Sequence, residues 1–167
     1  DITYIGTDGD GLCMYNNKTR QCQQYTSETL FDGYSFDDVI TSLFLDGEFL
    51  WIGTYNKGVF ALSTKTGKAS FAKQLSGMPE KNISTIFVDS QQNVWIGTYE
   101  GGVFVFNKKS KLFERHYTGY EGDQYQTISC NGSTCFYEDS ENSIWIGSYY
   151  GITKIRRNRE ITIYRYD

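Results

Sequence analysis

Residues 94–104 read VWIGTYEGGVF, and this stretch decides the fold because it recurs along the chain. It returns as LWIGTYNKGVF at residues 50–60 and as IWIGSYYGI at residues 144–152. A more divergent copy, TYIGTDGDGL, occupies residues 3–12. The aromatic residues that lead the four copies are 47, 44 and 50 residues apart. A period of this length is typical of repeat architectures, so the repeat must be explained before any functional site.

Alternating apolar residues between turn signals predict four short antiparallel strands in each repeat. In the third repeat we expect them over residues 83–88, 93–98, 102–106 and 111–117. Four-stranded units with a period of roughly 40–50 residues are the blades of a β-propeller. A sandwich or barrel also contains many short strands, but it does not explain why the same phrase returns at the same place in each unit.

We therefore predict an all-β protein, a partial propeller or fragment of about four blades. The first blade lacks its first strand, and the last begins with a strand expected over residues 127–139. The predicted blades cover residues 1–26, 38–72, 82–117 and 127–167.

Composition agrees with a folded, β-rich chain that carries a small negative charge. Its 167 residues include 14 Tyr, 11 Phe and 3 Trp, and aromatic residues favour pleated, half-buried surfaces. The net charge of −4 gives no basic face, so we expect no nucleic-acid partner. No run of about 18 apolar residues is present, so we expect no membrane insertion by this segment. Because the sequence begins at Asp1 without a signal peptide, we interpret it as a mature or excised segment.

The repeated tryptophans and glycines are predicted to pack the blades together. Neighbouring residues of a strand point to opposite faces, so Trp95 and Gly97 share one face. The indole supplies bulk, and the glycine leaves room for the adjacent blade to approach. The residues assigned to this structural role are Trp51, Gly53, Trp95, Gly97, Trp145 and Gly147.

Acidic residues recur at the end of the first strand in three units, as Asp46, Asp89 and Asp139. Catalysis needs a residue once, whereas architecture needs it in every blade, so we assign these three to turns. Asp8 and Asp10 resemble part of a calcium loop, but the remaining acidic ligands of that motif are missing. We predict no catalytic residue, no metal site and no cofactor.

Four cysteines form two local pairs. With the intervening turn centred on Asn17 and Lys18, Cys13 and Cys22 are expected directly opposite each other, within disulfide range. Cys130 and Cys135 flank a natural turn in residues that only the last unit contains. We predict two disulfides and hence an oxidising compartment, the alternative being idle or buried thiols. Neither pair has the second Cys or His pair that zinc requires.

The repeated phrase resembles the two-component regulator propeller repeat. The resemblance rests on WIGT at residues 95–98, GGV at 101–103, Asn107, and the aromatic pair Phe113 and Tyr117. The link at residues 75–89 also fits. The chain departs from the pattern where Tyr4 replaces Trp, where cysteines replace aromatic residues in the first unit, and at the insertion near Cys130. It also has one residue fewer before Gly151.

The resemblance implies a non-catalytic sensor segment in the periplasm. Such repeats typically form the extracytoplasmic sensor of bacterial hybrid histidine kinases, many of which respond to glycan breakdown products. The kinase would then lie elsewhere in the parent protein.

Residues that could bind an oligosaccharide or another small ligand are expected on loops. The second-to-third turns and the links between blades emerge on one rim, and tyrosine offers a flat apolar face with a hydroxyl group. The alternative is that Tyr55, Tyr99 and Tyr149 are packing residues. The ligand-binding candidates are Tyr55, Tyr99, Tyr120, Tyr125, Tyr149 and Tyr150, and further loop candidates are Asp8, Phe31 and Tyr34.

Two other functions remain open. A partial propeller exposes aromatic blade faces, so we expect self-association or contact with further blades, and the segment could be a scaffold for dimerisation without a small ligand. Propellers also include lyases and glycosidases. An enzyme would need His116, the single histidine, beside paired carboxylates.

Overall fold

β-Strands make up nearly all the regular structure of the described residues. The computed structural model describes residues 2–25, 39–66, 69–71, 75, 78–119, 128–129 and 131–165. Within these residues fifteen strands form four antiparallel sheets. Among the same residues we find no helix with the length and hydropathy that a membrane span needs.

Each sheet runs up and down in chain order, and its strands lie inside the range predicted for one blade. Sheet 1 contains β1 (Ile2–Gly6), β2 (Leu12–Asn16) and β3 (Gln21–Tyr25). Sheet 2 contains β4 (Ile40–Asp46), β5 (Phe49–Thr54), β6 (Val59–Ser63) and β7 (Ala69–Phe71). Sheet 3 contains β8 (Ile83–Val88), β9 (Asn93–Thr98), β10 (Val103–Asn107) and β11 (Leu112–Tyr117). Sheet 4 contains β12 (Ser133–Glu138), β13 (Ile144–Ser148), β14 (Gly151–Ile155) and β15 (Ile161–Tyr164).

The first strand of sheet 4 is shorter than the sequence predicts. Strand β12 begins at Ser133, not at residue 127, and its pairing with β13 shifts at a bulge between Ser133 and Cys135. The buried Ile128 precedes this strand and packs into the core as part of the link, with its N–H donated to the carbonyl of Thr118 at 3.0 Å. Apolar character therefore extends further along the chain than the strand does.

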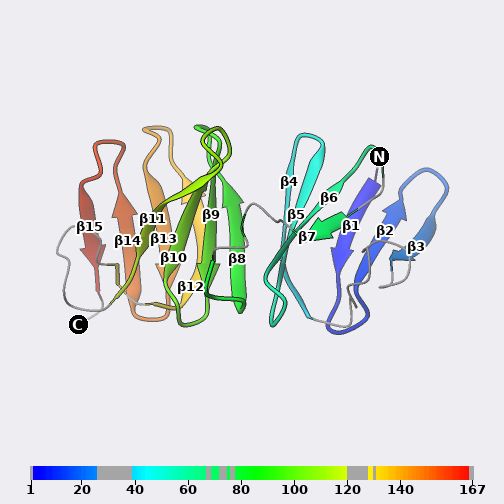
Figure 1. Cartoon of the computed structure of the whole chain (residues 1–167), viewed down its shortest axis with the longest axis horizontal. Helices are drawn as coiled ribbons and strands as arrows, with labels where there is room; N and C mark the ends of the chain where they lie inside the picture. The colour runs from blue at the N-terminus through cyan, green and yellow to red at the C-terminus, as the bar shows by residue number, and fades with distance from the viewer. Residues whose placement is uncertain are drawn as a thin grey trace.

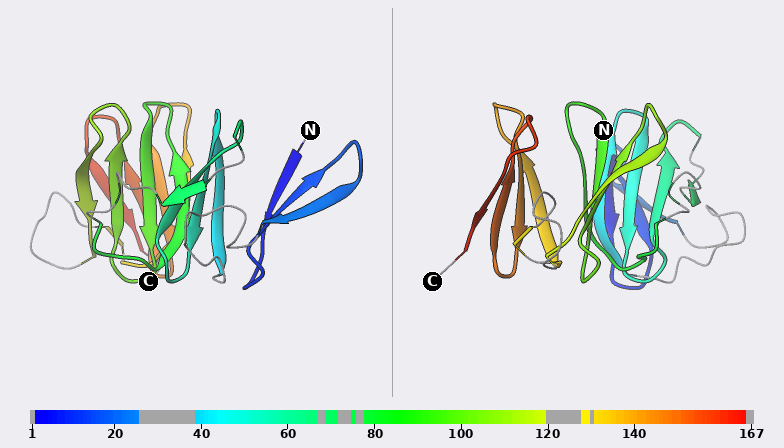
Figure 2. Two further views of the ribbon diagram at one scale, coloured as in Figure 1. Left: turned by 45° about the vertical axis from the view of Figure 1, so that its right-hand side comes forward. Right: turned by 60° about the vertical axis from the view of Figure 1, so that its left-hand side comes forward.

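The four sheets follow one another along the molecule, with the first and the last at opposite ends (Figures 1 and 2). We name the two faces of a sheet by the repeated phrase. The forward face carries the leading aromatic residue and the glycine two positions later, and the backward face carries the isoleucine between them. Each interface joins the forward face of one sheet to the backward face of the next.

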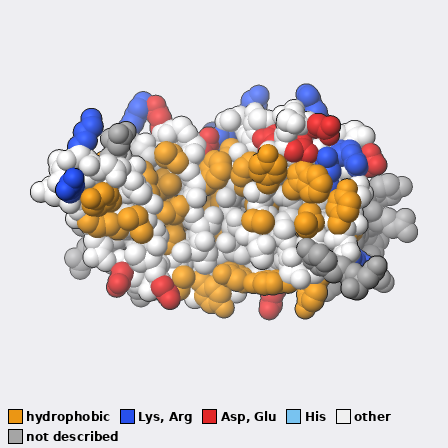
Figure 3. Space-filling model, turned by 180° about the vertical axis from the view of Figure 1, so that it is seen from behind, with side chains coloured by type: hydrophobic (Ala, Val, Ile, Leu, Met, Phe, Trp, Pro, Cys, Tyr) orange, Lys and Arg blue, Asp and Glu red, His pale blue; other side chains and the backbone are white. Residues whose placement is uncertain are grey.

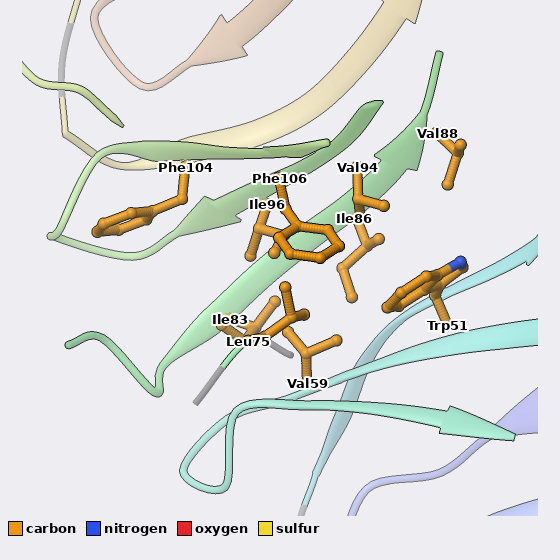
Figure 4. Close-up of a cluster of buried hydrophobic side chains, with 10 residues drawn as sticks. All are labelled: Trp51, Val59, Leu75, Ile83, Ile86, Val88, Val94, Ile96, Phe104 and Phe106. Carbon is orange, nitrogen blue, oxygen red and sulfur yellow. The ribbon is translucent and has the colours of Figure 1, made fainter. Parts of the chain in front are cut away.

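The interface between sheets 2 and 3 shows this arrangement (Figure 4). Trp51 of sheet 2 lies in one cluster with Ile86, Ile96 and Phe106 of sheet 3, all buried. Large apolar side chains removed from water contribute roughly 1.5–3 kcal/mol each to folding. The core is therefore a series of seams between sheets.

The repeated glycines lie where the next sheet approaches most closely. A Cβ atom added to Gly53 would lie 2.8 Å from Cγ2 of Ile83, the first residue of β8. Added to Gly97, it would overlap the hydroxyl of Ser133, the first residue of β12. Gly6 meets Ile40 of β4 in the same way. A side chain at these positions would push the following sheet away.

In sheet 1 a tyrosine takes the place of the repeated tryptophan. Tyr4 packs against the cluster that joins sheets 1 and 2, together with Tyr25. Burial raises the pKa of the Tyr4 phenol, and the nearby Tyr25 raises it further. Sheet 1 thus keeps the forward-face packing with a smaller ring.

Cys13 and Cys22 form a disulfide with a Cα–Cα distance of 6.4 Å, but the expected register is wrong. Cys13 lies opposite Gln24, and Cys22 lies opposite Tyr15, so the bond runs diagonally across one face of the strand pair. The difference in register arises in the turn that joins β2 to β3.

The turn after Asn16 lies one residue further along the chain than the sequence analysis assumed, over residues 17–20. The Asn16 side chain accepts hydrogen bonds from the N–H groups of Lys18 and Thr19, at 2.9 and 3.1 Å. Arg20 then takes a positive φ of 60° and donates its N–H to the Asn16 carbonyl at 2.8 Å. Asn16 therefore pairs with Gln21. The corresponding turn in sheet 3 begins at Asn107 and has the same construction.

The second expected disulfide is not formed at Cys135. This residue is a free, exposed thiol on β12, and its sulfur packs over Gly147 of the neighbouring strand. Cys130 lies outside the described residues. A cross-strand position opposite a glycine thus holds Cys135 without a covalent partner.

Candidate functional site

The turns between the second and third strands form one rim of the molecule, and backbone hydrogen bonds join them to the following sheet. Gly58 in the turn of sheet 2 donates its N–H to the carbonyl of Lys81, two residues before β8, at 3.0 Å. Gly102 in the turn of sheet 3 donates to the carbonyl of Asn131, two residues before β12, also at 3.0 Å. The rim is therefore continuous from sheet 2 to sheet 4.

A hydroxyl and a glycine build each of these turns. The hydroxyl of Thr98 donates to the carbonyl of Gly102 at 2.8 Å, and Thr54 donates to Gly58 at the same distance. Gly102 has a φ of 87°, a region in which side chains are strained. A Cβ atom there would also overlap the carbonyl oxygen of Tyr117. This hydroxyl bond explains why Thr or Ser directly follows the first glycine of the repeated phrase.

The tyrosine that follows the hydroxyl residue projects from the rim. The rings of Tyr55 and Tyr99 meet edge to face across the junction between sheets 2 and 3, with centroids 5.3 Å apart and planes at 72°. Their exposed fractions are 43% and 36%. Two sheets therefore contribute one ring each to a shared aromatic surface.

Gly132 continues this surface towards sheet 4. A Cβ atom on Gly132 would lie 2.7 Å from the carbonyl oxygen of Tyr99 and 3.4 Å from the ring of Tyr149. Tyr149 and Tyr150 are exposed on the turn of sheet 4. We call Tyr55, Tyr99, Tyr149 and Tyr150 the tyrosine rim.

Of the other loop candidates, Asp8 is the one that falls within the described residues. Asp8 lies at the turn of sheet 1, where it forms an isolated bridge with Val39. Tyr120, Tyr125, Phe31 and Tyr34 lie outside the described residues. The structure thus brings together the turn tyrosines of three sheets and leaves the link aromatics as predictions.

A hollow of about 300 Å³ lies beside the outer strands of sheet 3. Its lining includes Met78 and Pro79 of the link and Phe104, Phe113 and His116 of the sheet. The His116 ring stacks on Phe104 with centroids 3.9 Å apart, and its Nε2–H donates to the carbonyl of Gly101 at 2.6 Å.

The role of His116 has a counterpart in sheet 1. There Gln24 donates from Nε2 to the carbonyl of Asp10 at 2.7 Å. Asp10 and Gly101 each precede the turn glycine, so both side chains hold the same position of the repeat. The His116 side chain thus links the fourth strand of sheet 3, β11, to the turn at Gly101. Among the described residues, no group of three or more His, Cys, Asp or Glu side chains could hold a metal ion.

The recurring aspartates have a further role that the sequence analysis missed. The indole N–H of Trp95 donates to Oδ2 of Asp89 at 2.8 Å, and Trp145 donates to Asp139 at 2.8 Å. The indole N–H of Trp51 donates a longer hydrogen bond to Asp46, at 3.4 Å. The sequence contains a signal for this hydrogen bond, because an aspartate precedes the repeated tryptophan by five or six residues in each full unit.

Asp139 is strongly stabilised in its charged form. The hydrogen bond from the Trp145 indole lowers the pKa of this carboxyl most, and the backbone N–H of Ser143 lowers it further. Desolvation opposes the shift, and Lys154, 3.1 Å away, supports it. The pKa of Asp139 therefore lies well below its ordinary value of 3.8, and the carboxylate is unsuited to carry a proton near neutrality.

Two segments of the chain, residues 77–100 and 127–150, match the sequence model of the family described as "Two component regulator propeller". Each match covers the first two strands of its sheet and ends in the turn that follows them. A comparison with the sequences of curated proteins finds no match.

Solved structures share the fold over nearly the whole chain. The extracellular domain of BT3049 from B. thetaiotaomicron, assigned as a hybrid two component system, superimposes with a TM-score of 0.78 at 25% identity. The alignment covers 98% of this chain and 21% of that domain. The extracellular domain of BT4673 from the same organism gives 0.74 at 20% identity, covering 99% and 22%. The chain thus spans about a fifth of the length of these two domains.

A virginiamycin B lyase from Staphylococcus aureus has a TM-score of 0.67 at 14% identity, covering 94% of this chain and 49% of the lyase. At that identity the likeness concerns the fold alone. The all-β propeller fold predicted from the repeat is confirmed. Residues 77–100 and 127–150 thus match the two-component regulator propeller model, within a stretch of propeller that resembles the extracellular domain of a hybrid two component system.

Proposed function

We propose that this chain is a non-catalytic ligand-recognition segment of a two-component signalling protein, with the tyrosine rim as its binding surface. Three findings support the proposal: the two matching repeats, the 25% identity to an extracellular domain of a hybrid two component system, and the shape of the rim. The parent protein would be a periplasmic sensor whose histidine kinase lies outside this segment. The disulfide between Cys13 and Cys22 supports an oxidising location.

The single observation that carries the proposal is the edge-to-face contact of Tyr55 with Tyr99. Two exposed rings that belong to different sheets offer apolar faces and hydroxyl groups within one small area. Such a surface suits a sugar ring, whose C–H groups can pack on the tyrosine rings and whose hydroxyl groups can form hydrogen bonds with the phenols. We therefore propose a glycan fragment as the ligand, in agreement with the class implied by the family resemblance.

The rim also provides a route for relaying the signal. A ligand that touches both Tyr55 and Tyr99 adds binding energy across the junction between sheets 2 and 3. It therefore favours one packing of these sheets over any other. The relay would begin as a change in the population of sheet arrangements.

Thermal-shift and calorimetric titration of the protein with a panel of oligosaccharides tests the proposal. We expect one glycan class to raise the melting temperature, and the Tyr99→Ala and Tyr55→Ala variants to weaken its binding at least tenfold. Phe49→Ala is the matched control, since Phe49 is an exposed aromatic residue at the far end of β5. Equal binding by all variants, or no stabilisation by any glycan, would sink the proposed role of the rim.

An enzymatic function has less support. The single histidine ties a turn in the manner of Gln24, and the likeness to lyases concerns the fold alone. A scaffold role without a small ligand has a specific observation in its favour, the exposure of Tyr137, Ile152 and Tyr164 on sheet 4.

A further inference from the structure

The last turn of three sheets, the one before the final strand, carries the same pair of cations. These turns contain Lys18-Thr19-Arg20 in sheet 1, Lys109-Ser110-Lys111 in sheet 3 and Arg157-Asn158-Arg159 in sheet 4. They lie along one edge of the molecule, uppermost in Figure 1, and all six basic side chains are exposed. We call Lys18, Arg20, Lys109, Lys111, Arg157 and Arg159 the basic edge. Packing explains the repeated tryptophans and glycines, but it does not explain a repeated charge that faces water.

The second cation of each pair has a backbone conformation that favours glycine. Arg20, Lys111 and Arg159 have φ values of 60°, 59° and 70°. This left-handed region is costly for a residue with a Cβ atom, and residues held in it point to a functional role. At the corresponding place in sheet 2 the sequence reads Lys65-Thr66-Gly67. A basic side chain is thus kept at three positions where glycine would be less strained.

Hydrogen bonds within the turns hold the basic edge in place. The Asn107 side chain accepts the N–H groups of Lys109 and Ser110, at 2.9 and 3.1 Å, and the Asn107 carbonyl accepts that of Lys111 at 2.9 Å. Asn16 holds the turn of sheet 1 in the same way. Charges on a rigid turn lose little freedom when they meet an anionic surface.

The acidic residues at this edge already have partners among the described residues. Ion pairs join Asp46 to Lys108, Glu48 to Lys65, Asp139 and Glu141 to Lys154, and Glu160 to Arg156. Hydrogen bonds engage Asp89, Glu114 and Glu138. None of the six cations of the basic edge forms an ion pair with the part of the chain that the structure describes. They are therefore available to an external anion.

Exposed apolar side chains lie among these cations. Leu112 directly follows Lys111 and is 63% exposed. In sheet 2, Leu45 and Phe49 lie on either side of the hairpin at the same edge and are 57% and 48% exposed. Basic residues combined with exposed leucine and phenylalanine are the composition of amphipathic surfaces that bind lipid headgroups. A soluble polyanion would use the cations alone.

The opposite edge carries exposed acidic residues beside the tyrosine rim. Its turns expose Asp8, Asp10 and Glu100, and the cation among the described residues of those turns is the half-buried Lys57. In Figure 3, Lys and Arg side chains stand along the upper edge, whereas the lower edge shows mainly apolar and acidic side chains. An anionic surface therefore attracts the basic edge more than the tyrosine rim.

We propose that the basic edge, together with Leu112 and Phe49, binds the anionic phospholipid headgroups of a membrane surface. The contact is peripheral, because the cations supply the attraction and the apolar side chains reach only the headgroup boundary. The turns lie at an edge of the sheets and not on a face, so sheets packed before sheet 1 or after sheet 4 would leave them open. The tyrosine rim points away from the membrane, and the proposal does not depend on what binds there.

Flotation with lipid vesicles tests the proposal. We expect the protein to bind vesicles of equal parts phosphatidylcholine and phosphatidylglycerol, to ignore phosphatidylcholine alone, and to detach as salt is raised. Lys109→Glu combined with Lys111→Glu should weaken binding at least about tenfold. The matched control is Lys81→Glu combined with Arg165→Glu, which changes the net charge equally on two exposed residues at the opposite edge.

Lys111→Gly combined with Arg159→Gly separates lipid binding from folding. Glycine relieves the positive φ at both positions, so we expect this variant to be at least as stable as the parent protein in thermal unfolding. It should nevertheless bind the anionic vesicles less tightly, because it lacks two of the six charges. A variant that keeps its stability and its full vesicle binding contradicts the proposal.

Dextran sulfate distinguishes a lipid surface from a soluble polyanion. Leu112→Ser should weaken vesicle binding at least about threefold and leave binding to dextran sulfate unchanged, because only the lipid offers an apolar boundary. The proposal is overturned if the protein ignores anionic vesicles at low salt. It is also overturned if the matched control loses as much binding as the Lys109 and Lys111 variant, or if Leu112→Ser binds vesicles like the parent protein.

Discussion

The indole N–H of Trp95 donates a hydrogen bond of 2.8 Å to Oδ2 of Asp89, and both residues are buried. The same carboxylate accepts the backbone N–H of Asn93 at 2.7 Å and its side-chain amide at 2.8 Å. One aspartate thus holds the hairpin between β8 and β9 and orients the ring that fills the seam with sheet 4.

Replacing Asp89 with Ala should therefore destabilise the fold. The substitution leaves the Trp95 indole and the Asn93 amide without their acceptor, and a buried unsatisfied group costs about 1–3 kcal/mol. We expect urea denaturation to show a loss of at least about 2 kcal/mol. Asp10→Ala, at an exposed turn position, serves as the control and should stay within about 0.5 kcal/mol of the parent protein. Equal losses for both would mean that the Asp–Trp pair contributes little.

The lowered pKa of Asp139 predicts a pH dependence with a defined sign. A carboxyl whose pKa is depressed by folding contributes stability above its unfolded value of about 3.9, and this is lost as pH falls through the folded pKa. The difference in unfolding free energy between the parent protein and Asp139→Asn should therefore be constant near neutrality and shrink below about pH 4. Denaturation curves at several pH values measure it, and a difference that grows in acid would contradict the assignment.

The seam glycines should differ in their tolerance of a methyl group. In Gly97→Ala the new Cβ would overlap Ser133 and lie 2.7 Å from Cγ2 of Thr85, so we expect a loss of roughly 1–3 kcal/mol. In Gly147→Ala the nearest atom is the exposed sulfur of Cys135, which can rotate away. Thermal unfolding of the two variants, at a concentration where the chain is monomeric, makes the comparison. Similar melting temperatures would show that the interface between sheets 3 and 4 accommodates the added methyl group at little cost in stability.

The disulfide of sheet 1 should contribute measurably to stability. Cys13 and Cys22 are nine residues apart, and the chain-entropy model gives about 2–3 kcal/mol for a loop of that size. Cys13→Ser combined with Cys22→Ser should lower the unfolding free energy by this amount and remove its sensitivity to dithiothreitol. Cys135→Ser is the control, and we expect it to unfold like the parent protein. A parent protein insensitive to reductant would contradict the prediction.

The tie between His116 and Gly101 should be replaceable by glutamine. Gln24 makes the same bond in sheet 1, so His116→Gln is expected to retain most of the stability. His116→Ala should lose about 0.5–1.5 kcal/mol from the missing hydrogen bond, plus the stacking on Phe104. Chemical denaturation measures both variants. A glutamine variant as unstable as the alanine variant would show that the ring, and not the donor, matters.

The repeat predicted the sheets well because its residues satisfy needs that recur in every unit. Gly53 and Gly97 lie where a neighbouring sheet approaches, and Trp95 fills the adjoining seam. A period of this length, together with alternation, already specifies four-stranded units. Architecture is visible in a sequence when the same physical requirement is met several times.

Features that occur in one repeat alone were predicted less well. The predicted register of Cys13 with Cys22 was wrong because hydrogen bonds to the Asn16 side chain decide where the turn begins. The start of β12 was misplaced because Ile128 is apolar through burial in a link, not in a strand. Likewise the edge contact of Tyr55 with Tyr99 depends on how two sheets are spaced, which alternation within one sheet does not encode.

The contact of each seam glycine with the first strand of the following sheet has a mechanical consequence. Every such contact involves only consecutive sheets, so the stretch resembles a one-dimensional array whose free energy is a sum of units and junctions. A defect at Gly97 weakens one joint and leaves the packing of sheet 1 on sheet 2 untouched. Damage therefore stays where it occurs, and a whole unit can be inserted or deleted wherever the two new neighbours match.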